Sequence, residues 1–92
     1  MDVGYVWDED KYEKVKEKHD VFFHEVVSAM EDPKGFEQPD EASYEEGQWI
    51  WVGQTAQRRV LVVVYSDEDL PIFRIITAFD AEGRWLDEYQ QG

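Results

Sequence analysis

The sequence predicts a single α+β domain, in which an antiparallel sheet is packed by helices from both ends of the chain. Three observations lead to this fold class. Two segments with helical periodicity open the chain, three strand-like segments with short connections follow, and an amphipathic segment closes it. A length of 92 residues suits one domain, and 42% hydrophobic residues supply the efficient core that so short a chain needs. The expected order of elements is β-α-α-β-β-β-β-α, over residues 1–92.

The first strand and the first helix are expected at the N-terminus. The segment VGYVW alternates weakly, as a short strand does, and Asp8 after it is a favourable helix N-cap. The helix is expected to end near residue 18. One face has the helical spacing of an inward stripe, formed by Tyr12, Val15 and His19. The neighbouring face carries a row of lysines: Lys11, Lys14 and Lys18.

A second helix is expected after a break at residues 20–21. Its apolar positions follow the 3.6-residue period from Phe23 to Met30. Pro33 ends it, because the residue before a proline resists helical geometry. The stretch GFEQPDEASYEEG, rich in turn formers and acids, then predicts a short strand and an exposed loop between residues 39 and 47. This loop is either a solvated linker or a contact for a basic partner.

Three strands are expected next, at residues 48–54, 58–66 and 71–79. The connections TAQ and DEDL are short enough for hairpins, which favours an antiparallel meander. The strands are apolar on both faces, so both faces of the sheet need a cover. The two N-terminal helices are expected to cover one face. The C-terminal segment DAEGRWLDEYQQ should cover part of the other, and a partner the rest.

The net charge of −13 counts against a function in binding RNA, DNA or anionic lipid, unless a local basic patch survives. The charge fits a basic partner, or plain solubility. Cysteine is absent, which excludes disulfides and cysteine-based zinc sites. The N-terminus does not read as a signal peptide, and the apolar run VLVVVY is too short to cross a bilayer. We therefore expect a cytoplasmic protein without a membrane partner.

Several short motifs, taken in order, resemble BrnT-type toxins. The opening YVWDEDKYEKVKEKHDVFFHEV and the later EDP are similar to the family's W-D-x-x-K, K-H-G-V-x-F-x-E and D-P motifs. The second half, with VG, RVLVVVYS and FRIITAFDA, is similar to its I-G, L-x-V-V-Y-T and R-I-I-S-A-R-x-A motifs. The resemblance implies a RelE-like fold and a metal-independent ribonuclease toxin that uses no cofactor. It also implies a cognate antitoxin with a ribbon-helix-helix domain.

The resemblance implies three catalytic candidates. Lys18 and His19 fall on the family's K-H pair, and Arg74 falls on the arginine of its R-I-I motif. Cleavage by a neighbouring 2′-hydroxyl needs groups that move protons and cations that stabilise the charged phosphate. A histidine changes its charge near neutral pH, so His19 is the expected proton carrier. Lys18 and Arg74 are the expected phosphate clamps.

The chain departs from the family pattern at four positions. Phe79 and Gln48 stand where the family has arginines, Val15 where it often has asparagine, and Asp20 where it has glycine. The two missing arginines remove donors that a phosphate site needs, so activity is expected to be weak or absent. Arg58 and Arg59, at a hairpin, are either turn charges or replacements in space for those arginines.

Two functions from different classes therefore remain open. The first is a toxin component that cleaves RNA and is held inactive by its antitoxin. The second is a catalytically weakened relative that acts as a binding module and engages another protein through Trp49 and Trp51 on one sheet face. A homodimer is also possible. Each candidate also has a purely structural interpretation. His19 would then pack and cap its helix, the lysine row would be a solvated face, and the two tryptophans would belong to the core.

Overall fold

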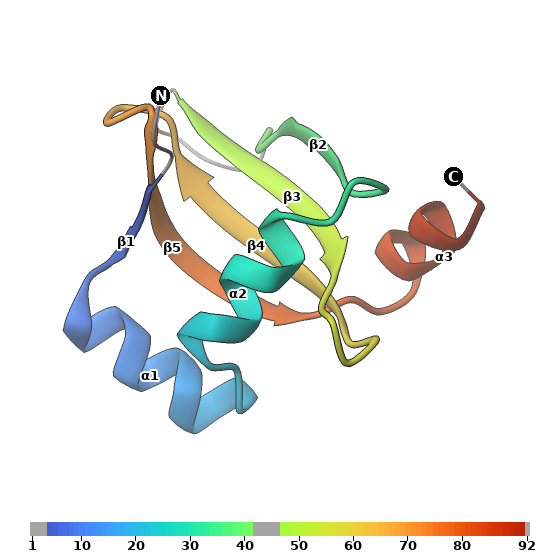
Figure 1. The fold of residues 1–92 in the computed structure, drawn as a ribbon, viewed down its shortest axis with the longest axis horizontal. Helices are drawn as coiled ribbons and strands as arrows, with labels where there is room; N and C mark the ends of the chain where they lie inside the picture. The colour runs from blue at the N-terminus through green and yellow to red at the C-terminus, as the bar shows by residue number, and fades with distance from the viewer. Residues whose placement is uncertain (1–3, 42–46, 92) are drawn as a thin grey trace.

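The computed structural model describes residues 4–41 and 47–91, which form one layered α+β unit (Figure 1). The predicted loop at 39–47 lies largely outside these residues. The elements follow the predicted order, and in chain order they are β1 (Gly4–Trp7), α1 (Glu9–His19), α2 (Phe23–Met30), β2 (Phe36–Pro39), β3 (Gln48–Gln54), β4 (Val60–Ser66), β5 (Ile72–Asp80) and α3 (Arg84–Gln91). Within the described residues, no helix has the length and apolarity to span a membrane.

The sheet has five strands in the order β1-β5-β4-β3-β2. The predicted meander of β3, β4 and β5 is confirmed, because both pairs are antiparallel. β4 begins at Val60, two residues later than expected. Residues 55–59 form the hairpin turn instead, and Arg58 there has the positive φ of 70° that closes a three-residue loop. β1 pairs in parallel with β5, so the start of the chain lies beside its last strand.

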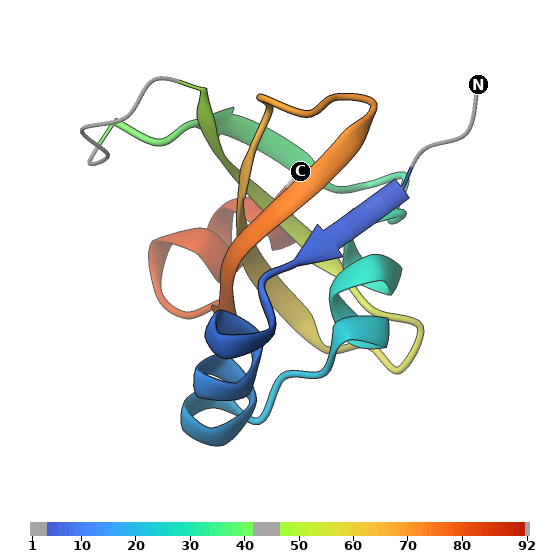
Figure 2. The same ribbon diagram turned by 90° about the vertical axis from the view of Figure 1, so that its left-hand side faces the viewer.

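The helices divide between the two faces and one edge of the sheet. Figure 2 shows α2 and α3 on opposite sides of the strands, while α1 runs past the end of β1 along β5. Both N-terminal helices contribute to one core cluster, although α1 lies at the edge of the sheet and not over its face as expected. Its buried members are Trp7, Val15, Val21, Val26, Ala29, Leu61, Val63, Tyr65, Ile75 and Ala78.

The second face of the sheet is partly covered by α3, which confirms the prediction for the C-terminal segment. Trp85, Leu86 and Tyr89 of α3 pack against buried Val52 and Val62. The Tyr89 hydroxyl also donates a hydrogen bond to the Asp32 carboxylate. This bond connects α3 to the segment that follows α2. Towards β1 this face carries exposed apolar side chains, which are Val6 and Ile72.

The contact between α2 and β3 depends on glycine at position 53. A Cβ atom there would lie 2.1 Å from the carbonyl oxygen of Ala29, so no larger residue fits without moving the helix. The close approach lets the indole N–H of Trp51 donate to the same carbonyl at 2.7 Å. The same carbonyl also accepts from the N–H of Asp32 at 3.2 Å, so both of its hydrogen bonds lie at the end of α2.

Candidate functional site

A groove of about 310 Å³ lies between α1 and β5, and we call it the lysine groove. Its lining consists of Lys11, Lys14, Val15, Lys18, His19, Ile76 and Thr77. The groove forms because β1 ends at Trp7, which leaves the second half of β5 to be flanked by the helix. Val15 is buried at its base, and the three lysines are exposed. The predicted lysine row and His19 therefore meet at one site.

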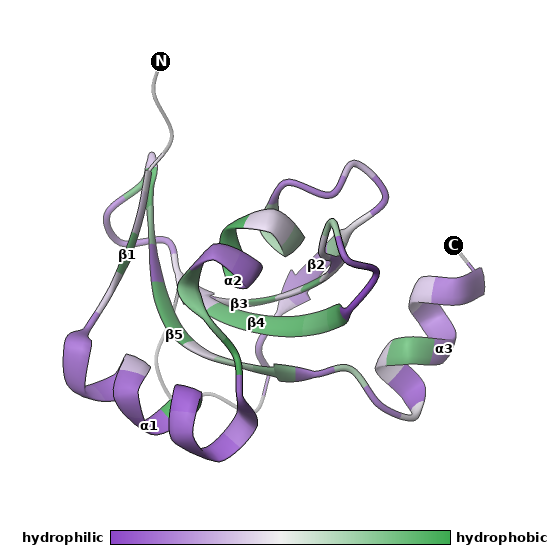
Figure 3. Cartoon of the chain, turned by 60° about the horizontal axis from the view of Figure 1, so that its bottom comes forward, coloured by the Kyte–Doolittle hydropathy of each residue, from purple (hydrophilic) through white to green (hydrophobic). Residues whose placement is uncertain are grey.

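The N-cap and the helix dipole favour the distribution of charge along α1. The Asp8 side chain caps the helix by accepting from the N–H groups of Asp10 and Lys11, at 3.1 and 3.2 Å. The acids of the first turn thus lie at the positive end of the dipole, while the basic residues of the last turn lie at the negative end. Lys16, outside the groove, is paired with Glu13 at 3.0 Å. Figure 3 shows α1 as mostly hydrophilic, whereas β4 in the sheet is mostly hydrophobic.

His19 is half-buried at the end of the groove. Its ring lies 6.0 Å from the ring of Phe79, measured between centroids, at an angle of 46°. Its carbonyl oxygen accepts from Arg59 at 3.0 Å. His19 thus has the packing contact that a structural role requires and also lines a groove that is open to solvent.

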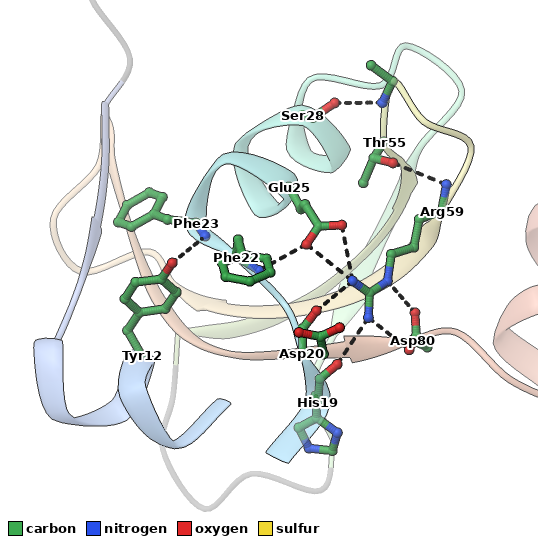
Figure 4. Close-up of polar contacts among 11 residues, drawn as sticks. Tyr12, His19, Asp20, Phe22, Phe23, Glu25, Ser28, Thr55, Arg59 and Asp80 are labelled. Atoms are coloured by element: carbon green, nitrogen blue, oxygen red, sulfur yellow. Dashed lines mark hydrogen bonds and ion pairs between the residues drawn. The ribbon is translucent and has the colours of Figure 1, made fainter. Parts of the chain in front are cut away.

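Arg59 forms a network at the C-terminal end of α1 (Figure 4). A guanidinium has five N–H donors, and the acceptors here are the carbonyl oxygens of His19 and Asp20 and the carboxylates of Glu25 and Asp80. The hydrogen bond and charge of Asp80 raise the pKa of Arg59 further, against the opposing effect of burial. The same hydrogen bond from Arg59 lowers the pKa of Asp80. Arg59 therefore does not replace a missing phosphate-binding arginine, because its donors are already used.

Arg74 does not line the lysine groove. Its Nε donates to the Asp69 carboxylate at 2.7 Å, and both side chains are about half exposed. Arg74 pairs with Val6 and lies two residues before Ile76, about 7 Å along the strand from the groove. The structure thus brings Lys18 and His19 together at the end of α1. Arg74 lies outside the groove, in the first half of β5, where that strand pairs with β1.

Trp49 and Trp51 are half-buried and pack against the cluster under α2. Both indole N–H groups have internal acceptors, which are the Asp67 carboxylate for Trp49, at 2.9 Å, and the carbonyl of Ala29 for Trp51. These contacts agree with the core interpretation. The exposed part of each ring is what a partner would contact, and a partner-binding role stays a prediction.

Three of the four departures from the family pattern, at Val15, Asp20 and Phe79, lie in or beside the groove. Phe79, besides facing His19, packs with the cluster under α3. Asp20 caps the C-terminal end of α1 in the left-handed conformation, with φ 54° and ψ 43°. Gln48 lies in β3 and pairs with Ser66 of β4. An aromatic ring and a carboxylate thus border the groove at positions where the resemblance implies a cation and a glycine.

Sequence reasoning missed three features of the site. Ile76 and Thr77 form the wall opposite the helix, and nothing in their type marks them as functional. The structural role of Arg59 was also missed. The one available signal was the place of Arg59 in the hairpin connection between β3 and β4, and that signal did not show which carbonyls the side chain reaches.

One mixed sheet lies between α2 and α3, with α1 at its edge, and a solved structure has a similar fold. A crystal structure of the Brucella abortus ribonuclease toxin BrnT matches it with a TM-score of 0.57 and 18% sequence identity, covering 89% of this chain and 100% of that one. No curated protein matches the chain. A family model described as ribonuclease toxin, BrnT, of type II toxin-antitoxin system matches residues 7–84. The chain therefore belongs to the BrnT family of ribonuclease toxins, which confirms the resemblance and the predicted α+β class.

Proposed function

We propose that this chain is the toxin of a type II toxin–antitoxin pair and that it cleaves RNA at the lysine groove without a metal ion. The observation that carries the proposal is the gathering of three lysines and a histidine in one groove of a protein with net charge −13. Such a local excess of cations attracts a polyanion at short range in spite of the surrounding carboxylates. The family membership supplies the substrate class, since the family consists of ribonuclease toxins.

The proposed reaction is an internal transfer at phosphorus. The 2′-oxygen of one nucleotide attacks the adjacent phosphate, the bond from phosphorus to the 5′-oxygen breaks, and a 2′,3′-cyclic phosphate and a 5′-hydroxyl result. His19 takes the proton of the 2′-hydroxyl, and an acid returns a proton to the leaving oxygen. Lys18 stabilises the charge that grows on the phosphate, while Lys11 and Lys14 hold neighbouring phosphates. Arg74 contacts RNA that extends along β5.

The reaction is expected to be slow. Phe79 offers a ring where the resemblance implies a guanidinium, and a ring donates no hydrogen bond to a phosphate. Loss of one preorganised donor typically costs about 10²–10³ in the rate of the chemical step. Asp20 adds a negative charge next to His19, which opposes the approach of RNA.

The proposed partner is an antitoxin, because the family consists of type II toxins. A ribbon-helix-helix antitoxin in the cytoplasm fits the resemblance, and a basic binding segment would complement the acidic surface of this chain. Trp49 and Trp51 remain the proposed contact for such a partner. A second copy of the chain is the alternative partner, and the mass of the purified protein in solution shows whether the chain forms a dimer by itself.

Growth of a bacterium that expresses the chain from an inducible promoter tests the proposal. We expect growth arrest with the unaltered chain and none with His19→Ala. His24→Ala is the matched control, because His24 is the other histidine of the chain, is exposed on α2, and does not line the groove. Harmless overproduction of the folded, unaltered chain would instead favour the protein-binding alternative.

Cleavage of a fluorescent RNA oligonucleotide by the purified protein tests the chemistry directly. We expect products that end in a 2′,3′-cyclic phosphate, a rate that EDTA does not change, and no cleavage where the attacking nucleotide is 2′-deoxy. His19→Ala should lower the rate by about 10²-fold or more, as loss of a general base does. Equal rates for His19→Ala and His24→Ala would refute the assignment of His19.

A further inference from the structure

We propose that Arg59 is a positioning residue for His19, which fixes where the imidazole stands at the end of the lysine groove without touching RNA itself. Its contribution to cleavage rests on the proposed function, whereas its contribution to the geometry does not. The proposal arises from Figure 4, in which one guanidinium from the β3–β4 hairpin meets the ends of α1, α2 and β5.

The backbone carbonyl of His19 lies at the C-terminal end of α1, within reach of Arg59. The last carbonyl groups of a helix lack partners within it. Arg59 donates to two of them in α1, at 3.0 Å for His19 and 2.8 Å for Asp20. These bonds hold the final turn against fraying and fix the direction in which the side chain of His19 leaves the helix. Only the two side-chain torsions of His19 then remain to place the ring.

Arg59 also contacts β5, the strand that forms the other wall of the groove. Arg59 donates to Asp80 through Nε at 2.6 Å and through a terminal nitrogen at 3.0 Å. Asp80 ends β5 directly after Phe79, the residue whose ring faces His19. Arg59 therefore connects the end of α1 to the strand that it faces, and so sets the separation between His19 and β5.

Glu25 of α2 holds the guanidinium of Arg59 in place through an ion pair. Glu25 accepts from Arg59 at 3.1 Å and also from the N–H of Phe22 at 3.1 Å, so this carboxylate is itself held in place. The side chains of Glu25 and Arg59 are only 14% and 24% exposed, which limits their exchange with water. A planar guanidinium with a rigid fork of donors suits this set of acceptors. A lysine ammonium keeps the charge but presents its three donors around one nitrogen, so it cannot reach all of them.

The experiment compares Arg59→Lys with Arg58→Lys, the same substitution at the neighbouring exposed arginine. The first readout is the nuclear Overhauser contact between the rings of His19 and Phe79 in labelled full-length protein. We expect Arg59→Lys to lose it and to keep the contact between the stacked rings of Tyr5 and Phe73, which are 5.5 Å apart at the far end of β5. Arg58→Lys should keep both contacts.

The second readout is single-turnover cleavage of the RNA oligonucleotide. A misplaced catalytic group lowers the rate at saturation, and a shift of about 1 Å is enough for losses of up to about 10²-fold. We expect Arg59→Lys to lower the saturated rate at least about ten-fold, with the half-saturating concentration unchanged within about two-fold, since the lysines that bind RNA remain. A purely structural role would lower the folded fraction and leave the rate per folded molecule unchanged.

Each outcome decides the proposal. A folded Arg59→Lys protein that keeps the contact between His19 and Phe79, or that cleaves at the unaltered rate, overturns it. If Arg59→Lys also loses the contact between Tyr5 and Phe73, the chain is unfolded, and Glu25→Gln then provides the same two readouts with smaller changes. If the unaltered chain does not cleave RNA, the proposed function fails, and the ring contact alone judges the positioning of His19.

Discussion

Asp20 has a backbone conformation that glycine adopts with less strain. Its φ of 54° and ψ of 43° place it in the left-handed region, where helices commonly end with glycine. The resemblance to the family also implies a glycine at this position. The carboxylate of Asp20 therefore imposes both a backbone cost and a negative charge on the end of the lysine groove.

We expect Asp20→Gly to raise the free energy of unfolding by about 0.5–1 kcal/mol, because relief of the left-handed strain exceeds the entropy that glycine adds to the unfolded chain. It should also tighten RNA binding roughly two- to five-fold, since a nearby negative charge is removed. Urea unfolding and fluorescence anisotropy measure the two effects. Asp20→Asn is the control, because asparagine removes the charge but tolerates the same conformation, so it should change binding and hardly affect stability. Loss of stability in Asp20→Gly would contradict the strain argument.

At the same scale, the sequence identified Lys18 and His19 as neighbours in one site, but it did not show that Arg74 lies outside the lysine groove or which groups Arg59 contacts. Residues on one helix keep a fixed spacing, so a sequence shows that they share a face. Arg74 and the helix belong to different elements, and their separation depends on how α1 packs against β5. The contacts of Arg59 join segments about forty positions apart in the chain, which no local pattern reveals.

Among the elements, α3 is held to the rest of the chain by a hydrogen bond that depends on pH. Burial and the hydrogen bond to Asp32 raise the pKa of Tyr89 to about 12. Burial alone would raise the pKa of Asp32, but hydrogen bonds from Tyr89 and from the N–H groups of Lys34 and Gln54 lower it overall. The neutral hydroxyl of Tyr89 is thus favoured in the folded protein.

The stability from Tyr89 should be fully present below pH about 10, where an unfolded tyrosine is neutral, and lost as the pH rises through about 12. We therefore expect the free energy of unfolding, measured with urea, to fall across this interval. Tyr89→Phe should be about 1 kcal/mol less stable at pH 8, because it lacks the hydrogen bond. It should also lose less stability than the unaltered chain between pH 10 and 12. Parallel curves for the two proteins would show that Tyr89 does not contribute to this transition.

Most elements could be predicted from the sequence, since hydrophobic periodicity and turn residues mark α2 and the three long strands within two residues of their observed bounds. The parallel pairing of β1 with β5 could not be predicted in this way. A strand of four residues carries little pattern, and its partner is near the other end of the chain. The position of α1 at the edge of the sheet follows from that pairing, so it was also missed.

For the whole molecule, the net charge of −13 makes stability and RNA binding respond to salt in opposite directions. Like charges repel in the compact state, and salt screens this repulsion. We expect the unfolding temperature to rise as NaCl increases from low concentration to 0.5 M, by roughly 4–8 °C for each kcal/mol gained. A scanning calorimeter measures this rise, and a falling unfolding temperature would contradict it.

RNA binding at the groove should weaken over the same salt range. Three lysines that each neutralise one phosphate of a single strand predict a slope of about −2 for the logarithm of affinity against the logarithm of salt concentration. Lys14→Ala should reduce the steepness of that slope by about 0.7, because one phosphate contact is lost. Lys16→Ala, whose lysine is paired with Glu13 outside the groove, is the control and should leave the slope unchanged.

The order in which the groove walls are made has a consequence for synthesis of the protein. One wall comes from residues 11–19 and the other from residues 76–77, so most of the chain separates them in time. While a ribosome is translating the intervening strands, the helix is already made but has no β5 to face. A growing chain therefore has no assembled lysine groove until β5 has emerged from the ribosome and paired with the rest of the sheet.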